Sequence, residues 1–274
     1  MTLETRQFRA GPHDWRVIEG GDGPLVLLLH GAGASAESFA GVMAELACAF
    51  RVVAPDLPGH GGTRLGSTAR SGLKTMAADV VAMVSEAYGT PSLIVGHSAG
   101  GAVALQTDGI WGEAPRVLIN PALAPFDGAA GWVFPGLART LALTPFVTGM
   151  IARSFSGAGQ IRRLLAATGS PVTDEGVARY RALASRREHI RGTLMMMAAW
   201  DVRPLRARLP AFQAPVLFIL ATGDGTVAPD VARLEAQRMP IARSREIDGG
   251  HLVHEERPGD VAKLISEFAS ATNA

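Results

Sequence analysis

The sequence has a single cysteine, Cys48, among its 274 residues, so no intramolecular disulfide can form. A chain almost free of cysteine is typical of a reducing compartment, and a disulfide-stapled scaffold is excluded. Cys48 lies in the apolar stretch MAELACAF. This context predicts a thiol packed in the core rather than a nucleophile.

Long apolar runs and a large net charge are also lacking. The longest runs, PLVLLLH and PVLFILA, have the length of a strand and could not span a bilayer. The polar N-terminus, MTLETRQFRAGPHDW, lacks the apolar segment of a secretory signal. The formal net charge of +1 gives no reason to expect a nucleic-acid partner. We therefore expect a cytoplasmic protein with no transmembrane segment.

The composition nevertheless allows a large core. Hydrophobic residues make up 47% of the chain and charged residues 19%, which excludes a disordered protein. The length suits one large α/β domain, or one domain that carries a substantial insertion.

Short apolar runs alternate with helical stretches along most of the chain. Runs that are apolar throughout, as in strands buried on both faces, are expected to form strands. This alternation predicts an α/β fold with a mostly parallel sheet flanked by helices on both faces. The expected strands cover residues 15–19, 24–30, 50–56, 92–98, 115–121, 214–224 and 244–248, and the expected helices 35–50, 75–88, 229–237 and 258–270, with a further helix directly after Ser98.

Residues 121–208 break this alternation, because they contain helical stretches and no strand-like run. We interpret residues 1–120 and 209–274 as a core domain, and residues 121–208 as an inserted helical cap. The cap contains twelve arginines, no lysine and five carboxylates, so its formal charge is +7 against −6 for the remainder. Helices within the cap are expected at 136–143, 147–155, 160–168, 177–187 and 189–200.

The pentapeptide Gly96-His97-Ser98-Ala99-Gly100 matches the pattern G-x-S-x-G. This pattern places a nucleophilic serine on a sharp turn between a strand and a helix, where flanking glycines allow the backbone to approach itself closely. Ser98 follows the apolar run SLIV and precedes the apolar stretch AGGAVAL, which is the context that the pattern requires. We therefore predict that Ser98 is a nucleophile.

Two backbone amides are expected to stabilise an oxyanion beside this serine. The sequence His30-Gly31-Ala32-Gly33 ends an earlier strand, and the loop at this position supplies one N–H donor, while the residue after the nucleophile supplies the other. We assign these two donors to Ala32 and Ala99.

The acid and the base should follow late strands in the order serine, aspartate, histidine. Asp224 comes directly after the run VLFILATG, and His251 lies in a loop after SREID. A serine hydroxyl needs a base within hydrogen-bond reach, and the imidazole needs a carboxylate that fixes its tautomer. The predicted triad is therefore Ser98, Asp224 and His251.

Several other polar residues are weaker candidates. The histidines of HLVHEE, His251 and His254, lack the i, i+4 spacing of a zinc helix, and no metal or other cofactor is expected. His97 is interpreted as a residue that is packed or lines the site, and His60 as one that shapes its loop. Asp201 could act as a spare acid, but its helical surroundings favour a structural ion pair.

The segments HGAG, APDLPGHG, GHSAG, GDGTVAP and GGHLVHEERP occur in the order and spacing of the α/β-hydrolase superfamily, which the chain therefore resembles. The resemblance covers nearly the whole chain outside the cap. It implies an α/β-hydrolase fold, and the serine, aspartate and histidine of the family's triad match Ser98, Asp224 and His251.

A narrower resemblance rests on the cap. The segments NPALAPFDG, LLAATGS and LMMMAAWDVRPL are similar to those of the α/β-hydrolase proteins associated with magnesium chelatase in bacteriochlorophyll biosynthesis. This resemblance implies a role near the insertion of magnesium into protoporphyrin, with magnesium chelatase subunits as partners. It implies no particular reaction.

The sequence leaves two classes of function open. The first is a serine hydrolase acting on a small-molecule substrate, and an esterase, an amidase and a carbon–carbon bond hydrolase would all use this triad. The second is an accessory protein that keeps the fold and uses the pocket under the cap to hold a tetrapyrrole or a protein partner. The intact triad favours the enzyme.

The cap also suggests what the pocket accepts. An apolar ligand with peripheral carboxylates, such as a tetrapyrrole, would suit both the apolar residues and the arginines of the cap. Alternatively, the apolar residues pack cap helices onto the sheet, and the arginines face solvent, an acidic partner or the anionic lipids of a membrane surface. The residues expected to line the pocket are His30, Gly31, His97, Trp132, Met196 and Trp200.

Overall fold

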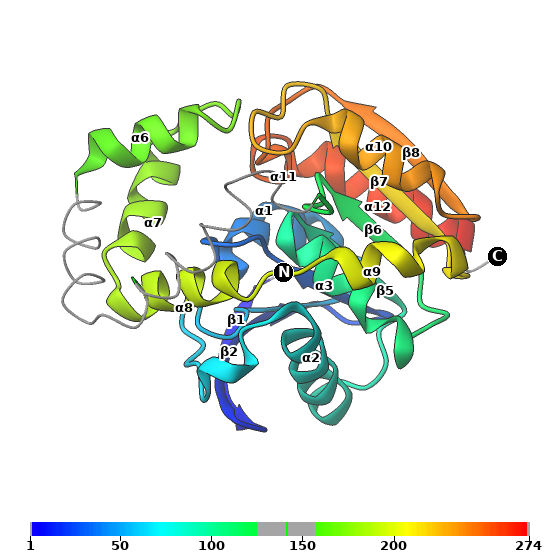
Figure 1. Ribbon diagram of the computed structural model, residues 1–274, viewed down its shortest axis with the longest axis horizontal. Helices are drawn as coiled ribbons and strands as arrows, with labels where there is room; N and C mark the ends of the chain where they lie inside the picture. Colours follow the sequence, from blue (N-terminus) through cyan, green and yellow to red (C-terminus); the bar gives the residue numbers. More distant parts are fainter. Residues whose placement is uncertain (1, 125–140, 142–156, 273–274) are drawn as a thin grey trace.

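The computed structural model describes residues 2–124, 141 and 157–272, and its centre is an eight-stranded sheet (Figure 1). The strand order is β1-β2-β4-β3-β5-β6-β7-β8. β2 pairs antiparallel with β1 and with β4, and every other pair of neighbours is parallel, so the predicted mostly parallel sheet is confirmed. The strands are β1 (Glu4–Ala10), β2 (His13–Gly20), β3 (Leu25–Leu29), β4 (Arg51–Pro55), β5 (Leu93–His97), β6 (Arg116–Ile119), β7 (Val216–Ala221) and β8 (Ala242–Ile247).

Helices cover both faces of this sheet. Alternate residues of β3 point to opposite faces, so Leu27 and Leu29 belong to one apolar cluster and Val26 and Leu28 to another. The first cluster includes residues of α2 (Leu73–Ala87), α3 (Ala99–Gln106) and α10 (Pro229–Gln237). The second includes residues of α1 (Ala40–Leu46) and α12 (Pro258–Thr272), and the short helix α11 (Val253–Glu256) precedes α12. β3, β5, β6 and β7, which lie between these layers, are therefore buried on both sides.

Two features of the structure differ from what the sequence predicts. The strand β1 is not predicted, because its sequence ETRQFRA has no apolar run and most of its residues stay exposed at the edge of the sheet. The prediction that Cys48 is a packed core thiol is wrong, because its side chain is exposed. Helix α1 ends at Leu46, and Leu46 and Ala47 take the buried positions, so the chain has already turned outward at Cys48.

Between β6 and β7, the described residues form helices and no strand. These helices are α6 (Ala158–Ala166), α7 (Asp174–Ala184), α8 (Arg187–Ala198) and α9 (Arg203–Arg208). Figure 1 shows α6, α7 and α8 grouped at one side of the sheet, while α9 runs back along α3. The helices expected at 136–143 and 147–155 fall almost wholly outside the described residues, and the cap boundaries at 121 and 208 stay a prediction. None of the described helices combines the length and apolar character needed to cross a membrane.

Helix α8 is joined to the core by a contact between two glycines. A Cβ atom added to Gly192 of α8 would lie 2.0 Å from the carbonyl oxygen of Gly59. One turn earlier in the helix, His189 is buried and accepts a hydrogen bond from the N–H of Gly61 at 3.0 Å through Nδ1. Its Nε2 donates to the carbonyl of Gly33 at 3.2 Å. The helix therefore packs directly on two loops of the core.

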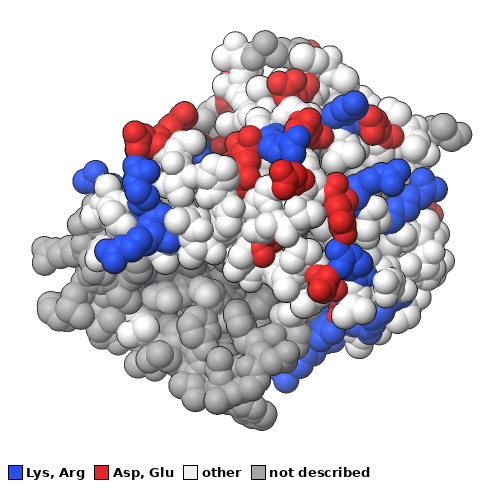
Figure 2. Space-filling view, turned by 90° about the horizontal axis from the view of Figure 1, so that it is seen from above, with Lys and Arg blue, Asp and Glu red and all other residues white. Residues whose placement is uncertain are grey.

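Ion pairs between the arginine-rich segment and the core account for part of the charge asymmetry. Arg208 pairs with Asp108 at 3.0 Å. Arg206 pairs with Glu235, and Arg179 pairs with Glu255. Figure 2 shows acidic and basic side chains interleaved on the face seen from above, rather than separated into patches. The positive excess of the segment is thus partly matched by carboxylates of the core.

Replacing Gly192 with alanine should destabilise the protein, because the added methyl group overlaps with the carbonyl of Gly59. Overpacking of this kind costs about 1–3 kcal/mol, and the gain of about 1 kcal/mol from replacing a helical glycine with alanine offsets only part of the cost that we expect for a methyl group against a backbone oxygen. Unfolding in urea measures the change.

The matched control is Gly159→Ala in α6, where no described atom lies within 4 Å of the added methyl group. This variant should be at least as stable as the wild-type protein, because alanine loses less conformational freedom than glycine on folding. If the Gly192→Ala variant proves as stable as the Gly159→Ala variant, the close contact between α8 and the Gly59 loop does not exist.

Candidate active site

Ser98 occupies the turn between β5 and α3 in a strained backbone conformation, with φ 51° and ψ −118°. Positive φ is uncommon for a residue other than glycine. A Cβ atom on Gly96 would lie 2.4 Å from the carbonyl oxygen of Gly100, and one on Gly100 would lie 2.1 Å from that of Leu29. The close approach expected from the two glycines is present, and it holds Ser98 at the carboxyl edge of the sheet.

The loop after β3 lies against this serine. A Cβ atom on Gly31 would be 3.1 Å from Cβ of Ser98. Ala32 and Ala99 line the same pocket as Ser98, and neither of their N–H groups donates a hydrogen bond to another described residue. Ala99 is also the first residue of α3, where the helix dipole favours negative charge. Both amides are therefore available to an oxyanion.

Asp224 and His251 are hydrogen-bonded to each other. Nδ1 of His251 donates to Oδ2 of Asp224 at 2.7 Å, and the Asp224 side chain is fully buried. The other carboxylate oxygen, Oδ1, accepts from the N–H groups of Thr226 at 2.7 Å and Val227 at 2.9 Å. These contacts fix the carboxylate and select the tautomer of His251 in which Nε2 carries the lone pair.

Ser98 and His251 line one pocket, but no hydrogen bond joins them among the described contacts. Catalytic hydrogen bonds are often long before a substrate binds, so this geometry is compatible with His251 as the base. The structure therefore brings Ser98, His251 and Asp224 together, with the tightest contact between the last two.

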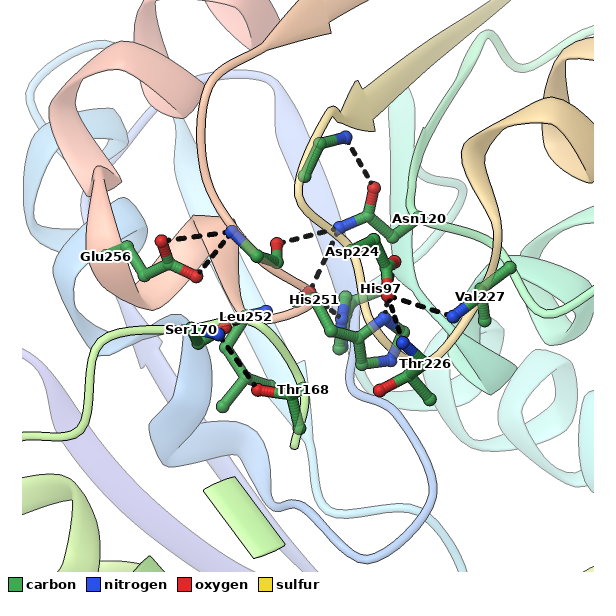
Figure 3. Close-up of polar contacts among 12 residues, drawn as sticks. His97, Asn120, Thr168, Ser170, Asp224, Thr226, Val227, His251, Leu252 and Glu256 are labelled. Carbon is green, nitrogen blue, oxygen red and sulfur yellow. Dashed lines mark hydrogen bonds and ion pairs between the residues drawn. The ribbon is translucent and has the colours of Figure 1, made fainter. Parts of the chain in front are cut away.

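The backbone of His251 is held by two side chains of the core (Figure 3). Its carbonyl accepts from Nδ2 of Asn120 at 3.0 Å and from Nε2 of His97 at 2.9 Å. Asn120 follows β6 with φ 44°, and its Oδ1 accepts from the N–H of Ala221 at the end of β7. Sequence reasoning missed this role of Asn120, although a polar residue between a buried strand and a proline was a usable signal.

Two buried histidines beside His251 stay neutral. His254 is fully buried, and its ring centroid lies 4.1 Å from that of His97. Burial lowers the pKa of His254 to about 3. Burial, with the neighbouring His254 and His251, also holds the pKa of His97 well below its usual value. Neither ring therefore places a positive charge next to His251 at neutral pH.

The pocket over Ser98 has a volume of about 570 Å³ and a mostly apolar lining. Gly31, His97, Met196 and Trp200 line it, as the sequence analysis expected, whereas Trp132 lies outside the described residues. The remaining lining residues include Ala34, Ala122, Leu164, Leu165, Thr168, Tyr180, Thr193, Met197, Val227, Val231 and Leu252.

The expectation that His30 also lines the pocket needs correction. His30 is fully buried behind the loop, where its Nδ1 donates to the carbonyl of Gly31 at 2.8 Å and its Nε2 accepts from the N–H of Leu57 at 2.9 Å. Both ring nitrogens are therefore used to hold the loop. His60 packs against His30 and donates to the carbonyl of Pro58, which agrees with a role in shaping its loop.

No arginine or lysine lines the pocket within the described ranges. The arginines of the cap that the structure describes lie on other surfaces, so they do not provide the carboxylate anchor that the sequence analysis considered. Arg139 and Arg153 fall outside the described residues. The described lining therefore suits an uncharged, apolar ligand group.

The other polar candidates named from the sequence lie outside the pocket or form no metal site. Asp201 is exposed and pairs with Arg203 at 2.8 Å, which confirms the structural ion pair. Across the described part of the chain, no group of three or more histidine, cysteine, aspartate or glutamate side chains is arranged to hold a metal ion.

Comparison with known proteins gives matches over most of the chain. The model of the alpha/beta hydrolase family matches residues 26–264. The chain is 44% identical over 263 residues to the magnesium-chelatase 30 kDa subunit of Rhodobacter capsulatus, which covers 95% of this chain and 92% of that protein. It is 41% identical over 105 residues to protein phosphatase methylesterase 1 of Bos taurus, which covers 35% of this chain and 27% of that protein.

Solved structures share the fold at low sequence identity. A thermophilic esterase from Thermogutta terrifontis superposes with a TM-score of 0.76 at 21% identity and covers 100% of both chains. A haloalkane dehalogenase variant from Bradyrhizobium elkanii superposes with a TM-score of 0.75 at 20% identity and covers 99% of this chain and 98% of that one. These likenesses show the fold alone, because proteins with different reactions share it.

The family match extends from β3 into α12 and so includes every strand of the parallel part of the sheet. The relative from Rhodobacter capsulatus is similar over almost its full length. Both findings agree with the resemblance seen in the sequence motifs. The chain belongs to the alpha/beta hydrolase family.

Proposed function

We propose that the protein is a serine hydrolase that cleaves an apolar ester or amide and acts in or near the magnesium chelatase step of bacteriochlorophyll biosynthesis. The observation that carries the proposal is the 2.7 Å hydrogen bond between His251 and the buried Asp224, beside a pocket that both His251 and the strained Ser98 line. A carboxylate that orients a histidine beside a serine that lines the same pocket is the arrangement that activates a nucleophile.

The reaction follows from the positions of these groups. His251 takes the proton of the Ser98 hydroxyl through Nε2, and Oγ attacks the substrate carbonyl. The N–H groups of Ala32 and Ala99 bind the oxyanion, and an interaction of this kind is worth about 3–4 kcal/mol. The imidazolium then protonates the leaving group, and water activated by the same histidine hydrolyses the acyl-enzyme.

The pocket supports an apolar substrate. Met196, Met197 and Trp200 of the helical segment line it, and no charged anchor is present among the described lining residues. Pockets of this kind bind through apolar area, with a few polar groups that orient the ligand. The serine, histidine and aspartate would also serve a carbon–carbon bond hydrolase. The choice of an ester or amide as the scissile bond therefore rests on analogy with esterases.

A second candidate is an accessory protein that binds a tetrapyrrole without cleaving it. The similarity to the magnesium-chelatase 30 kDa subunit favours this candidate. The apolar pocket of about 570 Å³ would bury much of a planar, apolar ligand. In this alternative, magnesium chelatase subunits are the partners, and Ser98 need not react.

Ser98 should react with a fluorophosphonate probe, because His251 removes its proton and the N–H groups of Ala32 and Ala99 hold the phosphonyl oxygen. Labelling is followed by mass spectrometry of the digested protein, and the label is expected at Ser98 and absent from a folded Ser98→Ala variant. If the wild-type protein stays unlabelled where a control esterase reacts, the nucleophile assignment is wrong and the accessory candidate gains.

Asp224→Asn should slow labelling by about 10⁴-fold, the cost in kcat of the analogous change in a serine triad, because the amide favours the wrong tautomer of the histidine. Asp201→Asn is the control, since Asp201 is exposed and pairs only with Arg203 among the described contacts. The labelling rates of the two variants are measured with the same probe, from samples quenched at successive times. A larger effect of Asp201→Asn than of Asp224→Asn would refute the choice of acid.

Protoporphyrin should quench tryptophan fluorescence in a saturable manner if the tetrapyrrole candidate is right, because Trp200 lines the pocket. Trp200→Phe should reduce the amplitude of quenching. Raised salt should leave the affinity nearly unchanged, since no arginine or lysine of the described residues lines the pocket. Non-saturable uptake, or binding that salt abolishes, would exclude this pocket as the site.

A further inference from the structure

The turn after α6 contacts both loops that carry the candidate acid and base. The carbonyl oxygen of Thr168 accepts a hydrogen bond from the N–H of Gly225 at 3.0 Å and another from the N–H of His251 at 2.9 Å. Gly225 follows Asp224 directly in the chain. One carbonyl oxygen of the helical segment thus joins the backbones of the two loops.

A serine in the same turn makes a third link. Oγ of Ser170 accepts from the N–H of Leu252 at 2.9 Å, directly after His251 (Figure 3). Ser170 is only 6% exposed, so this bond is shielded from solvent. Oγ1 of Thr168 donates to the carbonyl of Leu165 at 2.6 Å, which fixes the shape of the turn.

Glycines allow the three segments to touch backbone to backbone. Gly169 has φ 78°, and a Cβ atom there would lie 2.0 Å from the carbonyl oxygen of Gly223. A Cβ atom on Gly225 would lie 2.5 Å from the carbonyl oxygen of Ala167, and one on Gly250 would lie 2.3 Å from the carbonyl carbon of Gly169. No side chain separates the segments, so a shift of the turn is transmitted directly to both loops.

The sheet alone does not fix these loops. β7 ends at Ala221 and β8 at Ile247, so Asp224 and His251 both lie beyond the last paired residue. Asn120 and His97 hold the His251 backbone on the side of the core. The turn after α6 supplies further hydrogen bonds to the backbones of both loops.

We propose that Thr168, Gly169 and Ser170 form a positioning element that sets the geometry of the Asp224–His251 pair. The helical segment would then be part of the catalytic apparatus as well as a wall of the pocket. The inference rests on the proposed serine hydrolase function, because it concerns the acid and the base of that reaction.

Two substitutions test the element. Gly169→Ala places a methyl group against the Gly223 carbonyl and should lower the rate of fluorophosphonate labelling at Ser98 by about 10²-fold, as expected for a displacement of about 1 Å. Ser170→Ala leaves the N–H of Leu252 without its acceptor and should lower the rate by about tenfold. Ser170→Thr keeps the hydroxyl and should restore most of it.

Two readouts separate positioning from a general loss of stability. The first is the pH profile of labelling, whose midpoint should move in Gly169→Ala because the contact between His251 and Asp224 is altered. The second is the low-field proton NMR signal of the hydrogen bond between His251 and Asp224, which should shift or broaden. The control is Gly159→Ala in α6, which should change neither readout.

The outcomes are distinct. If Gly169→Ala and Ser170→Ala label at the wild-type rate with an unchanged pH midpoint and an unchanged NMR signal, the positioning proposal is overturned while the proposed function stands. If wild-type protein does not label at all, the proposed function fails, and the NMR signal alone decides whether the turn positions the pair. Should Gly169→Ala fail to fold, the Ser170→Ala and Ser170→Thr pair gives the same decision.

Discussion

At the carboxyl edge of the sheet, the backbones of several loops approach one another so closely that a single methyl group would overlap with a neighbour. Gly100 lies against Leu29, Gly169 against Gly223, and Gly192 against Gly59. These contacts bring the candidate nucleophile, acid and base to one pocket and attach the helical segment to them. Side chains such as Asn120 and Ser170 then add hydrogen bonds to loops that glycine has already brought into contact. The glycine-rich composition is therefore a requirement of the site.

Much of the fold could be predicted because its signals are local, and the same local signals single out the residues of the candidate site. Buried strands are apolar runs, and Ser98, Asp224 and His251 each follow such a run in the order that the family uses. The strand β1 could not be predicted, because its polar residues pair at an edge and need no apolar face. The exposure of Cys48 could not be predicted either. Its neighbours in the sequence are apolar, but that does not say where the helix ends and the chain turns outward.

The roles that depend on tertiary contact were beyond the sequence. Nothing local says that Thr168 accepts hydrogen bonds from residues 57 and 83 positions away. Composition suggested a carboxylate anchor built from the arginines of the cap, but the structure uses Arg179, Arg206 and Arg208 to pair with carboxylates of the core. An excess of charge in one segment can be matched by a deficit elsewhere in the same chain, and only the fold reveals the match.

The two edges of the sheet share a property that matters when many copies of the chain are crowded together. β1 closes one edge with exposed Glu4, Arg6 and Arg9, and β8 closes the other with exposed Arg243, Arg245 and Glu246. Charged side chains along an edge strand oppose the addition of a strand from a second molecule, which is the first step towards amyloid-like association. The parallel inner strands, which are mostly apolar, are thus kept from pairing with a second molecule by the charged strands at the two edges of the sheet.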